Sequence, residues 1–166
     1  FLELNKYGNS LDGYLASFGG KHRKNLKRDL KILALLNYSV VRNALQDFQR
    51  MIDLNSNRFE KKSFFAEDVF IHGFRRMLEL AYKRGELEML SIHINGKPEA
   101  VEAAILHKGV YTVLLGGNNL DITNIGKLLT IEHIKNAITG KAMIVDFLVD
   151  DCGWKRMWNM NEEPLY

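Results

Sequence analysis

Midway along the chain the apolar residues change from a helical spacing to a strict alternation, and this change constrains the fold most. Residues 90–94 alternate between apolar and polar side chains, and Asn95 and Gly96 follow directly. Because both residues tolerate the positive φ of a type I′ turn, the pair predicts a tight hairpin. A second strand begins near Glu99, and a third covers 110–115 after another turn. The sequence therefore predicts three consecutive antiparallel strands.

Helical spacing of apolar residues flanks these strands on both sides. Ser10 is a candidate N-cap for the first helix, and Gly85 is a candidate C-terminal stop for the fourth. Further strands are expected over 38–42 and 142–149, where β-branched residues gather. The expected helices cover 11–18, 21–36, a segment capped by Asn43 with Leu45, Phe48 and Ile52 inward, 67–84, 126–139 and 154–158.

This order of elements predicts an α/β fold, in which helices flank one central mixed sheet. The segment from Leu115 through the helix to Ala142 has the length of a βαβ unit, so the strands that it joins should be parallel neighbours. In an open sheet, ligands bind beyond the carboxyl ends of such strands. We therefore expect a ligand site where strand 110–115 ends.

Composition narrows the class of protein. The 166 residues fit a single domain, with hydrophobic and charged fractions of 46% and 26% that are ordinary for a soluble globular protein. No uncharged apolar run is long enough for a membrane span, and no signal peptide is recognisable, so we expect a cytoplasmic location. The missing initiator Met and the abrupt end at Tyr166 suggest a fragment of a longer protein. The net charge of +3 permits an anionic ligand without demanding one.

Gly126 and Lys127 stand at the start of the helix that follows the third hairpin strand. A glycine there leaves room for a phosphate to approach free backbone amides, which the helix dipole makes attractive to anions. Lys127 would add a point charge. The alternative is a loop glycine beside an exposed lysine.

A second candidate site lies at the end of the last strand, where Asp146, Asp150 and Lys155 occur within ten residues. A carboxylate at a strand end can orient a nucleophile or accept its proton, and a lysine can stabilise an oxyanion. The alternative is structural: Asp150 and its neighbour would cap the last helix and pair with its basic residues.

The stretch 21–31 is strongly basic and could bind RNA, a membrane surface or an anionic donor, although a solvated helix face is the commoner explanation of such a stretch. The five histidines show no spacing typical of metal ligands, so we expect no metal. The single cysteine, Cys152, has no nearby histidine and is interpreted as a structural thiol.

Considered together, these segments resemble a known family. Ser10 to Leu15 followed by Lys24 to Arg28, Gly126 to Leu129, and Asp146 to Trp158 are similar to motifs of the GNAT-like acyltransferases of cellulose biosynthesis (CelD/BcsL type), which are related to the FemAB aminoacyl transferases. The resemblance covers nearly the whole chain. It implies a GNAT fold and direct transfer of an acetyl or other acyl group from acyl-CoA to an amine or hydroxyl.

The resemblance also implies roles for individual residues. Donor pyrophosphate would bind at Gly126, Lys127 and Leu128, and the pantetheine arm would pass Leu114 and Leu115. In the catalytic reading, Asp146 or Asp150 orients or deprotonates the acceptor, and Lys155 stabilises developing charge. Trp154 stands where the family has a tyrosine, and an indole cannot donate a proton as a phenol can.

The acceptor is left open as a small molecule, a glycan or a peptide. One alternative is a FemAB-like transferase, in which aminoacyl-tRNA replaces acyl-CoA. Another is a non-catalytic domain that binds anions or assembles with a second copy or a second GNAT-like domain.

Overall fold

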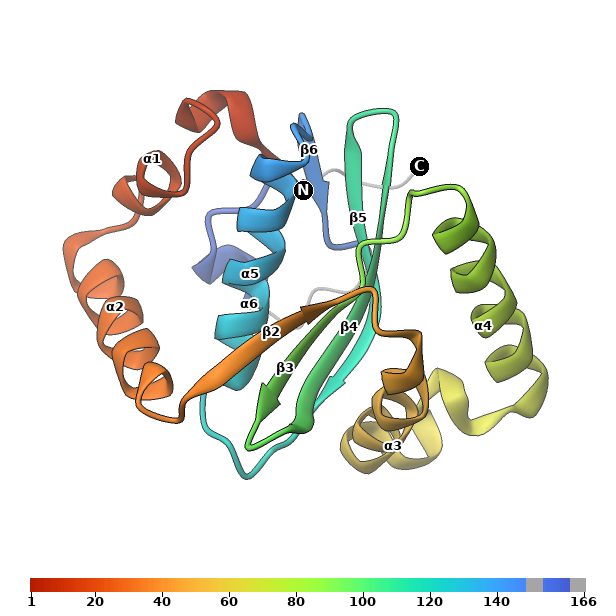
Figure 1. Ribbon diagram of the computed structural model, residues 1–166. Helices are drawn as coiled ribbons and strands as arrows, with labels where there is room; N and C mark the ends of the chain where they lie inside the picture. The colour runs from red at the N-terminus through yellow and green to blue at the C-terminus, as the bar shows by residue number, and fades with distance from the viewer. Residues whose placement is uncertain (149–153, 162–166) are drawn as a thin grey trace.

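The computed structural model describes residues 1–148 and 154–161 of the chain, and its centre is a six-stranded sheet (Figure 1). The strand order is β1-β6-β5-β4-β3-β2. The pair β5–β6 is parallel, and the other four neighbouring pairs are antiparallel. The strands are β1 (Leu2–Glu3), β2 (Tyr38–Arg42), β3 (Leu90–Ile94), β4 (Lys97–His107), β5 (Val110–Asn118) and β6 (Ile144–Asp146). The predicted α/β class with a mixed sheet is confirmed.

Helices cover both faces of this sheet. On one face α5 packs against β3, β4 and β5, and α1 and α2 pack on α5. On the other face α3 packs against β4 and β5, and α4 lies on the same side (Figure 1). The helices are α1 (Leu11–Ala16), α2 (Gly20–Ala34), α3 (Phe48–Phe59), α4 (Asp68–Lys83), α5 (Ile125–Thr139) and α6 (Trp154–Met157), with short 3-10 turns at Leu4–Tyr7, Leu45–Asp47, Glu60–Lys62 and Phe64–Ala66.

The turn between β3 and β4 is the predicted two-residue hairpin. Ile94 pairs with Lys97, and Asn95 and Gly96 both have positive φ, of 52° and 77°. The N-cap at Ser10 is also confirmed, because its side chain accepts a hydrogen bond from the Gly13 amide. Local turn and cap chemistry thus has the geometry that the sequence predicts.

The parallel pairing of β5 with β6 is confirmed, and it is short. It begins at Val110 opposite Ile144 and ends at Thr112 opposite Asp146, whereas β5 continues to Asn118. The predicted strand over 142–149 is therefore too long at both ends, and its last residue lies outside the described residues. The strand ends because the Asp146 side chain accepts a hydrogen bond from the Leu148 amide, and Leu148 has a positive φ of 54°. Beyond Thr112 one edge of β5 is no longer paired with β6.

One other expectation needs correction, and one strand was missed. Asn43 does not cap a helix: it has a φ of 54°, and its side chain accepts from the backbone amide of Met89, next to β3. The helix α3 starts at Phe48, after a 3-10 turn. Strand β1 was not predicted, because a two-residue strand is too short to show a period.

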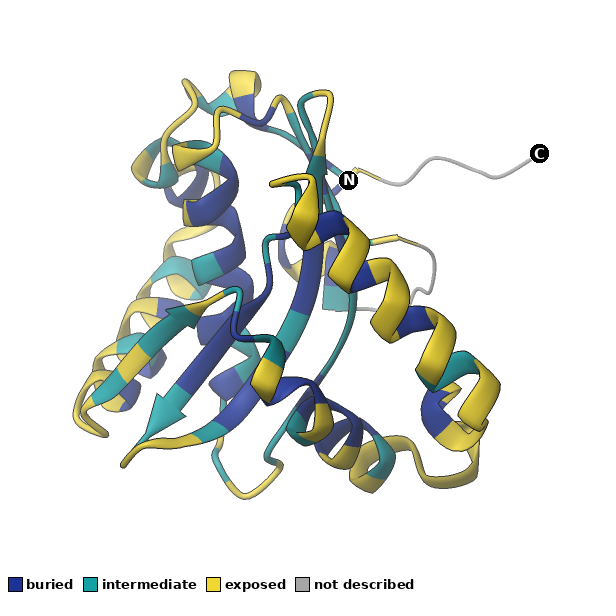
Figure 2. Cartoon of the chain, turned by 45° about the vertical axis from the view of Figure 1, so that its right-hand side comes forward, coloured by how far each residue is buried: buried dark blue, intermediate teal, exposed yellow. Residues whose placement is uncertain are grey.

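The apolar core of the described residues forms three clusters, two on the α5 face of the sheet and one on the face covered by α3 and α4. Tyr111 and Ala104 contribute to the α5 side, and Val101 and Ala103 contribute to the side of α3 and α4. Figure 2 shows buried residues along the sheet and on the inner sides of the helices, while α4 is exposed along its outward side. Among the described helices, none combines the length and the apolar character that a membrane span requires.

Candidate functional site

The carboxyl half of β5 carries an irregularity that separates it from a regular strand. Glu102 of β4 pairs with Gly116, and Ala104 pairs with Val113, so β5 has one extra residue between these pairs. Leu114 and Leu115 fall in this bulge and pack, partly buried, against the core on the α3 and α4 side. A bulge re-aims the backbone and side chains of a strand, and bulges are frequent beside active sites.

The first turn of α5 faces the end of β5. The Ile125 amide donates to the Ile122 carbonyl, and the Lys127 amide donates to Asn124. Between them, the Gly126 amide has no partner within the described residues. A Cβ added to Gly126 would meet only the Asn118 side chain, at 3.8 Å. This amide is therefore open to an anion at the positive end of the helix dipole.

Lys127 is not a free cation. Its Nζ atom lies 2.7 Å from Oδ2 of Asp29, a buried residue of α2 that also accepts from Arg28. The Lys127 hydrogen bond lowers the pKa of Asp29, burial opposes it, and the Arg28 hydrogen bond lowers the pKa further. The side chain of Leu128 is buried in the core between α2 and α5. Within this group, Gly126 supplies the unpaired backbone donor.

Asp146 and Lys155 converge on one peptide segment. Asp146 accepts from the Leu148 amide at 2.9 Å, and the ammonium of Lys155 donates to the Leu148 carbonyl. Lys155 is buried in α6. The two side chains together hold Leu148 in its left-handed conformation, which costs energy for a residue with a Cβ. Asp150 lies outside the described residues.

The predicted site residues thus form two groups. Asp146 lies opposite Thr112, and Gly126 lies beside Asn118, six residues further along β5. At the rise of an extended strand these positions are about 20 Å apart. A ligand that contacts both groups must be long and extended along β5.

A buried polar network on the α5 face was missed by sequence reasoning. The Tyr111 hydroxyl lies 2.8 Å from Nδ1 of His133, and Asn136 donates to this hydroxyl at 3.2 Å and to Glu88 at 2.5 Å. Burial raises the pKa of Tyr111 far above its ordinary value, so the phenol stays neutral. Nε2 of His133 lies 3.2 Å from a carboxylate oxygen of Glu102, without hydrogen-bond geometry.

Glu102 lies next to the β5 bulge. A Cβ on Gly116 would come within 2.7 Å of Cβ and Cγ of Glu102 and of the Val101 carbonyl oxygen, so this glycine makes room for the base of the Glu102 side chain. Part of the signal that could have found the network is visible in the sequence, because Glu102 interrupts the apolar run 100–106. His133 gives no such signal, because it follows Glu132 in a helix of mixed polar and apolar residues. Among the described residues, no three His, Cys, Asp or Glu side chains gather as a metal site would require.

The end of β5 is held from the other face by α3. Asn55 donates to the Gly116 carbonyl at 2.6 Å, and Arg58 donates to the Asn118 side chain at 2.9 Å. Gly117 is required here, because a Cβ would lie 2.4 Å from the Asn55 backbone nitrogen. The strand end beside Gly126 is therefore fixed by contacts with α3.

Comparisons with known proteins agree with this geometry. No curated protein matches the chain significantly. Among solved structures, a transcriptional regulator from Bacillus halodurans C-125 is 12% identical, with a TM-score of 0.60 over 78% of this chain and 97% of that chain. A predicted acetyltransferase with acetyl-CoA from Clostridium acetobutylicum is 7% identical, with a TM-score of 0.60 over 78% and 93%.

An aminoglycoside acetyltransferase from an uncultured soil metagenomic sample, in complex with sisomicin, is 15% identical, with a TM-score of 0.55 over 78% of this chain and 93% of that chain. At these identities the likeness concerns the fold. The model of the acetyltransferase (GNAT) domain family matches residues 20–156, which is most of the chain. The chain therefore belongs to the family of acetyltransferase (GNAT) domains.

Proposed function

We propose that this chain transfers an acyl group, acetyl foremost, from an acyl-CoA thioester to an amine or hydroxyl of an acceptor. The observation that carries the proposal is the parting of β5 from β6 beyond Thr112 and Asp146, with the open Gly126 amide about 20 Å further along β5. Acyl-CoA has an anionic pyrophosphate at one end of a long arm and the reactive thioester at the other. That shape suits two separated groups of residues.

In this proposal the donor lies along the unpaired edge of β5. The Gly126 amide receives the pyrophosphate, aided by the helix dipole. Lys127 contributes only a long-range electrostatic attraction to the pyrophosphate, because its ammonium is already hydrogen-bonded to Asp29. The segment of Leu114 and Leu115 borders the extended arm, and the side chain of Leu128 supports the helix start from the core.

The chemical step forms one bond and breaks one. The acceptor nitrogen or oxygen attacks the acyl carbon, and the bond from that carbon to the CoA sulfur breaks. The acceptor loses a proton to a base, and the departing thiolate gains one. Asp146 and Asp150 are our candidates to orient or deprotonate the acceptor. Lys155 acts through Leu148, whose carbonyl it binds, and holds the segment after β6 in place.

A FemAB-like alternative, with aminoacyl-tRNA as the donor, is favoured by one observation, the basic surface of α2. Within the same proposal, the chain is of the CelD/BcsL type. Its acceptor is a glycan, a peptide or a small molecule. The mild net charge of +3 and the shape of the β5 edge favour acyl-CoA over tRNA.

Thermal unfolding with each donor tests the proposal. Acetyl-CoA at about 100 times its dissociation constant should raise the free energy of unfolding by about 2.7 kcal/mol. Release of free CoA thiol with a panel of amines and alcohols then identifies the acceptor class. Stabilisation by aminoacyl-tRNA alone would identify aminoacyl-tRNA as the donor in place of acyl-CoA. Stabilisation by neither donor would reject the proposed catalysis.

A further inference from the structure

Positive charge on this chain is concentrated in one helix. α2 carries six Lys or Arg residues and a single acid, Asp29, which is a net charge of +5 in fifteen residues. The whole chain has a net charge of only +3, so the remaining residues together have a net charge of −2. An asymmetry of this kind indicates a surface that meets an anionic partner.

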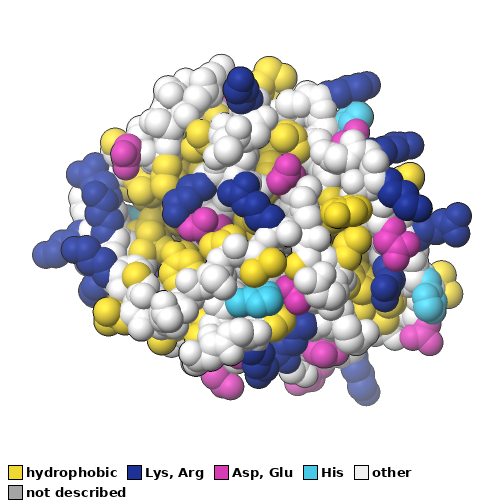
Figure 3. All heavy atoms as spheres, in the orientation of Figure 1, with side chains coloured by type: hydrophobic (Ala, Val, Ile, Leu, Met, Phe, Trp, Pro, Cys, Tyr) yellow, Lys and Arg dark blue, Asp and Glu magenta, His cyan; other side chains and the backbone are white. Residues whose placement is uncertain are grey.

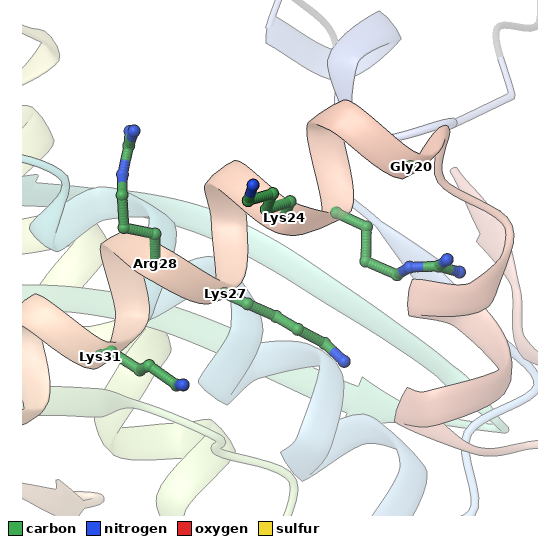
Figure 4. A pocket seen from close by; sticks show the side chains of 6 residues that line it. Gly20, Lys24, Lys27, Arg28 and Lys31 are labelled. Atoms are coloured by element: carbon green, nitrogen blue, oxygen red, sulfur yellow. The ribbon is translucent and has the colours of Figure 1, made fainter.

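The cations gather on the outward side of α2. Leu26, Asp29 and Leu33 are buried, and Lys24, Lys27 and Lys31 are exposed on the opposite side. They border a shallow groove lined by Gly20, Arg23, Lys24, Lys27, Arg28 and Lys31 (Figure 4). In the space-filling view, basic side chains stand out at the left edge, where α2 lies (Figure 3). Because α2 is the outermost layer of its face, nothing in the described chain shields this surface.

Three of these cations, Lys24, Lys27 and Lys31, form no ion pair within the described residues, whereas Arg23 donates to the Ala16 carbonyl and Arg28 pairs with Asp29. The ion pairs formed by α2 there involve only Arg28 and Asp29, with Lys127 as the partner from α5. The charges of Lys24, Lys27 and Lys31 are therefore available to an external anionic partner. Like charges three or four residues apart on a helix repel one another and lower its stability.

Two exposed apolar side chains extend the basic surface at its end. Leu35 is 83% exposed and Ile32 is 57% exposed. Leu35 follows Lys24, Arg28 and Lys31 at helical spacing, so it lies on the same stripe. A surface that combines clustered lysines with exposed leucine and isoleucine matches the interface of an anionic bilayer, where headgroups attract the lysines and the apolar tips insert.

We infer that the outward side of α2 docks this domain on a membrane surface that contains anionic phospholipids. The absence of Phe, Tyr and Trp from α2 favours a bilayer over single-stranded RNA, whose bases stack on aromatic side chains. The apolar side of α2 is buried in the core, so the contact involves the outward side only. Docking is therefore peripheral, reversible and sensitive to salt.

Vesicle sedimentation tests the inference with the purified chain. Vesicles of phosphatidylcholine with about 30% phosphatidylglycerol should bind it, and vesicles of phosphatidylcholine alone should not. Raising the salt from about 50 mM to about 500 mM should release most of the bound protein, because the screening length falls severalfold. Equal binding to both kinds of vesicle, or none to either, overturns the inference.

Charge reversal on two helices separates the α2 surface from net charge. Lys24→Glu, Lys27→Glu and Lys31→Glu together should weaken binding to anionic vesicles by more than about tenfold. The control is Arg76→Glu and Lys83→Glu on α4 with Arg84→Glu at its C-cap, which makes the same change in net charge and should keep most of the binding. Equal loss in both triple variants would show a general charge effect and reject α2 as the docking surface.

The apolar tips and the rival ligand have their own tests. Leu35→Ser should weaken vesicle binding more than Leu80→Ser, an exposed leucine of α4. If single-stranded RNA binds α2 more tightly than the vesicles do at equal salt, the partner of α2 is nucleic acid and the membrane inference is wrong. Each variant is also measured for unfolding and for stabilisation by acetyl-CoA, so that failure of docking is distinguished from failure of the proposed catalysis.

Discussion

The ammonium of Lys127 lies 2.7 Å from the buried carboxylate of Asp29, and this contact joins the start of α5 to the middle of α2. The two residues are 98 positions apart in the sequence. The contact gives Lys127 a structural task at the place where a donor-binding role was expected. It leaves the adjacent Gly126 amide as a backbone N–H of that helix start that is unpaired within the described residues and able to donate a hydrogen bond to an anion.

Removal of Lys127 should therefore affect folding more than donor binding. Lys127→Ala leaves the buried Asp29 with Arg28 as its remaining charged partner, and we expect a loss of about 1–2 kcal/mol in the free energy of unfolding. Acetyl-CoA affinity should fall by about 1 kcal/mol or less. Urea unfolding and calorimetry measure the two effects. The control is Lys135→Ala on the same helix, whose surface pair with Glu132 should matter by less than about 0.5 kcal/mol.

Stability should also depend on the charge of Asp29. Its pKa is held below the ordinary value, chiefly by Lys127, so the folded state binds its proton more weakly than the unfolded state does. The stabilisation is full above the unfolded-state pKa, about 3.9, and is lost as the pH falls through the lower folded-state pKa. Urea midpoints measured from about pH 6 to about pH 3 should fall more steeply for the wild type than for Asp29→Asn. Parallel curves would contradict this assignment.

Gly126→Val should abolish acetyl-CoA binding in a protein that still folds. The added side chain meets only Asn118 at 3.8 Å from its Cβ, so the fold tolerates it, but it covers the amide that receives the phosphate. Calorimetry with acetyl-CoA measures the loss. The matched control is Gly73→Val in α4, a second helical glycine whose Cβ would meet nothing within 4 Å, and its affinity should stay within about twofold of wild type. Unchanged affinity in Gly126→Val would move the donor site elsewhere.

Tyr111→Phe should destabilise the core without changing its shape. The substitution removes the hydroxyl that lies 2.8 Å from the fully buried His133 ring and leaves that ring nitrogen without its partner. We expect a loss of about 1–3 kcal/mol in the free energy of unfolding. Tyr82→Phe, on an exposed tyrosine of α4, serves as the control and should change stability by less than about 0.5 kcal/mol. A neutral Tyr111→Phe would mean that water or another group satisfies His133.

Lys155→Met should slow acyl transfer while acetyl-CoA affinity is kept. Methionine fills the buried space of the lysine stem but cannot donate to the Leu148 carbonyl, so the segment after β6 loses one of its two restraints. Misplacement of a positioning segment should reduce kcat by about tenfold to a hundredfold. Lys155→Arg keeps a donor and should restore part of the rate, and Lys83→Met on α4 should have no effect. Equal rates in Lys155→Met and wild type would exclude the positioning role.

The sequence by itself determined the features that depend on a few neighbouring residues. Asn95 and Gly96 specify their turn because their own backbones accept positive φ, and Ser10 caps α1 through an amide three residues away. The length between Leu115 and Ala142 also determined the parallel pairing of β5 with β6, because a crossover of that size returns the chain in the same direction. These predictions needed no knowledge of distant contacts.

Only the tertiary structure decided which distant side chains meet. Asparagine is a common helix cap, yet the Asn43 side chain accepts a hydrogen bond from the Met89 amide because β3 passes beside it. The sequence predicts Lys127 as a phosphate ligand, but in the folded chain its ammonium binds Asp29. Glu102 and His133 are neighbours because α5 packs on β4. The physical reason is that turns and caps follow from local dihedral preferences, whereas these contacts depend on sheet register and on how two helices pack across tens of residues.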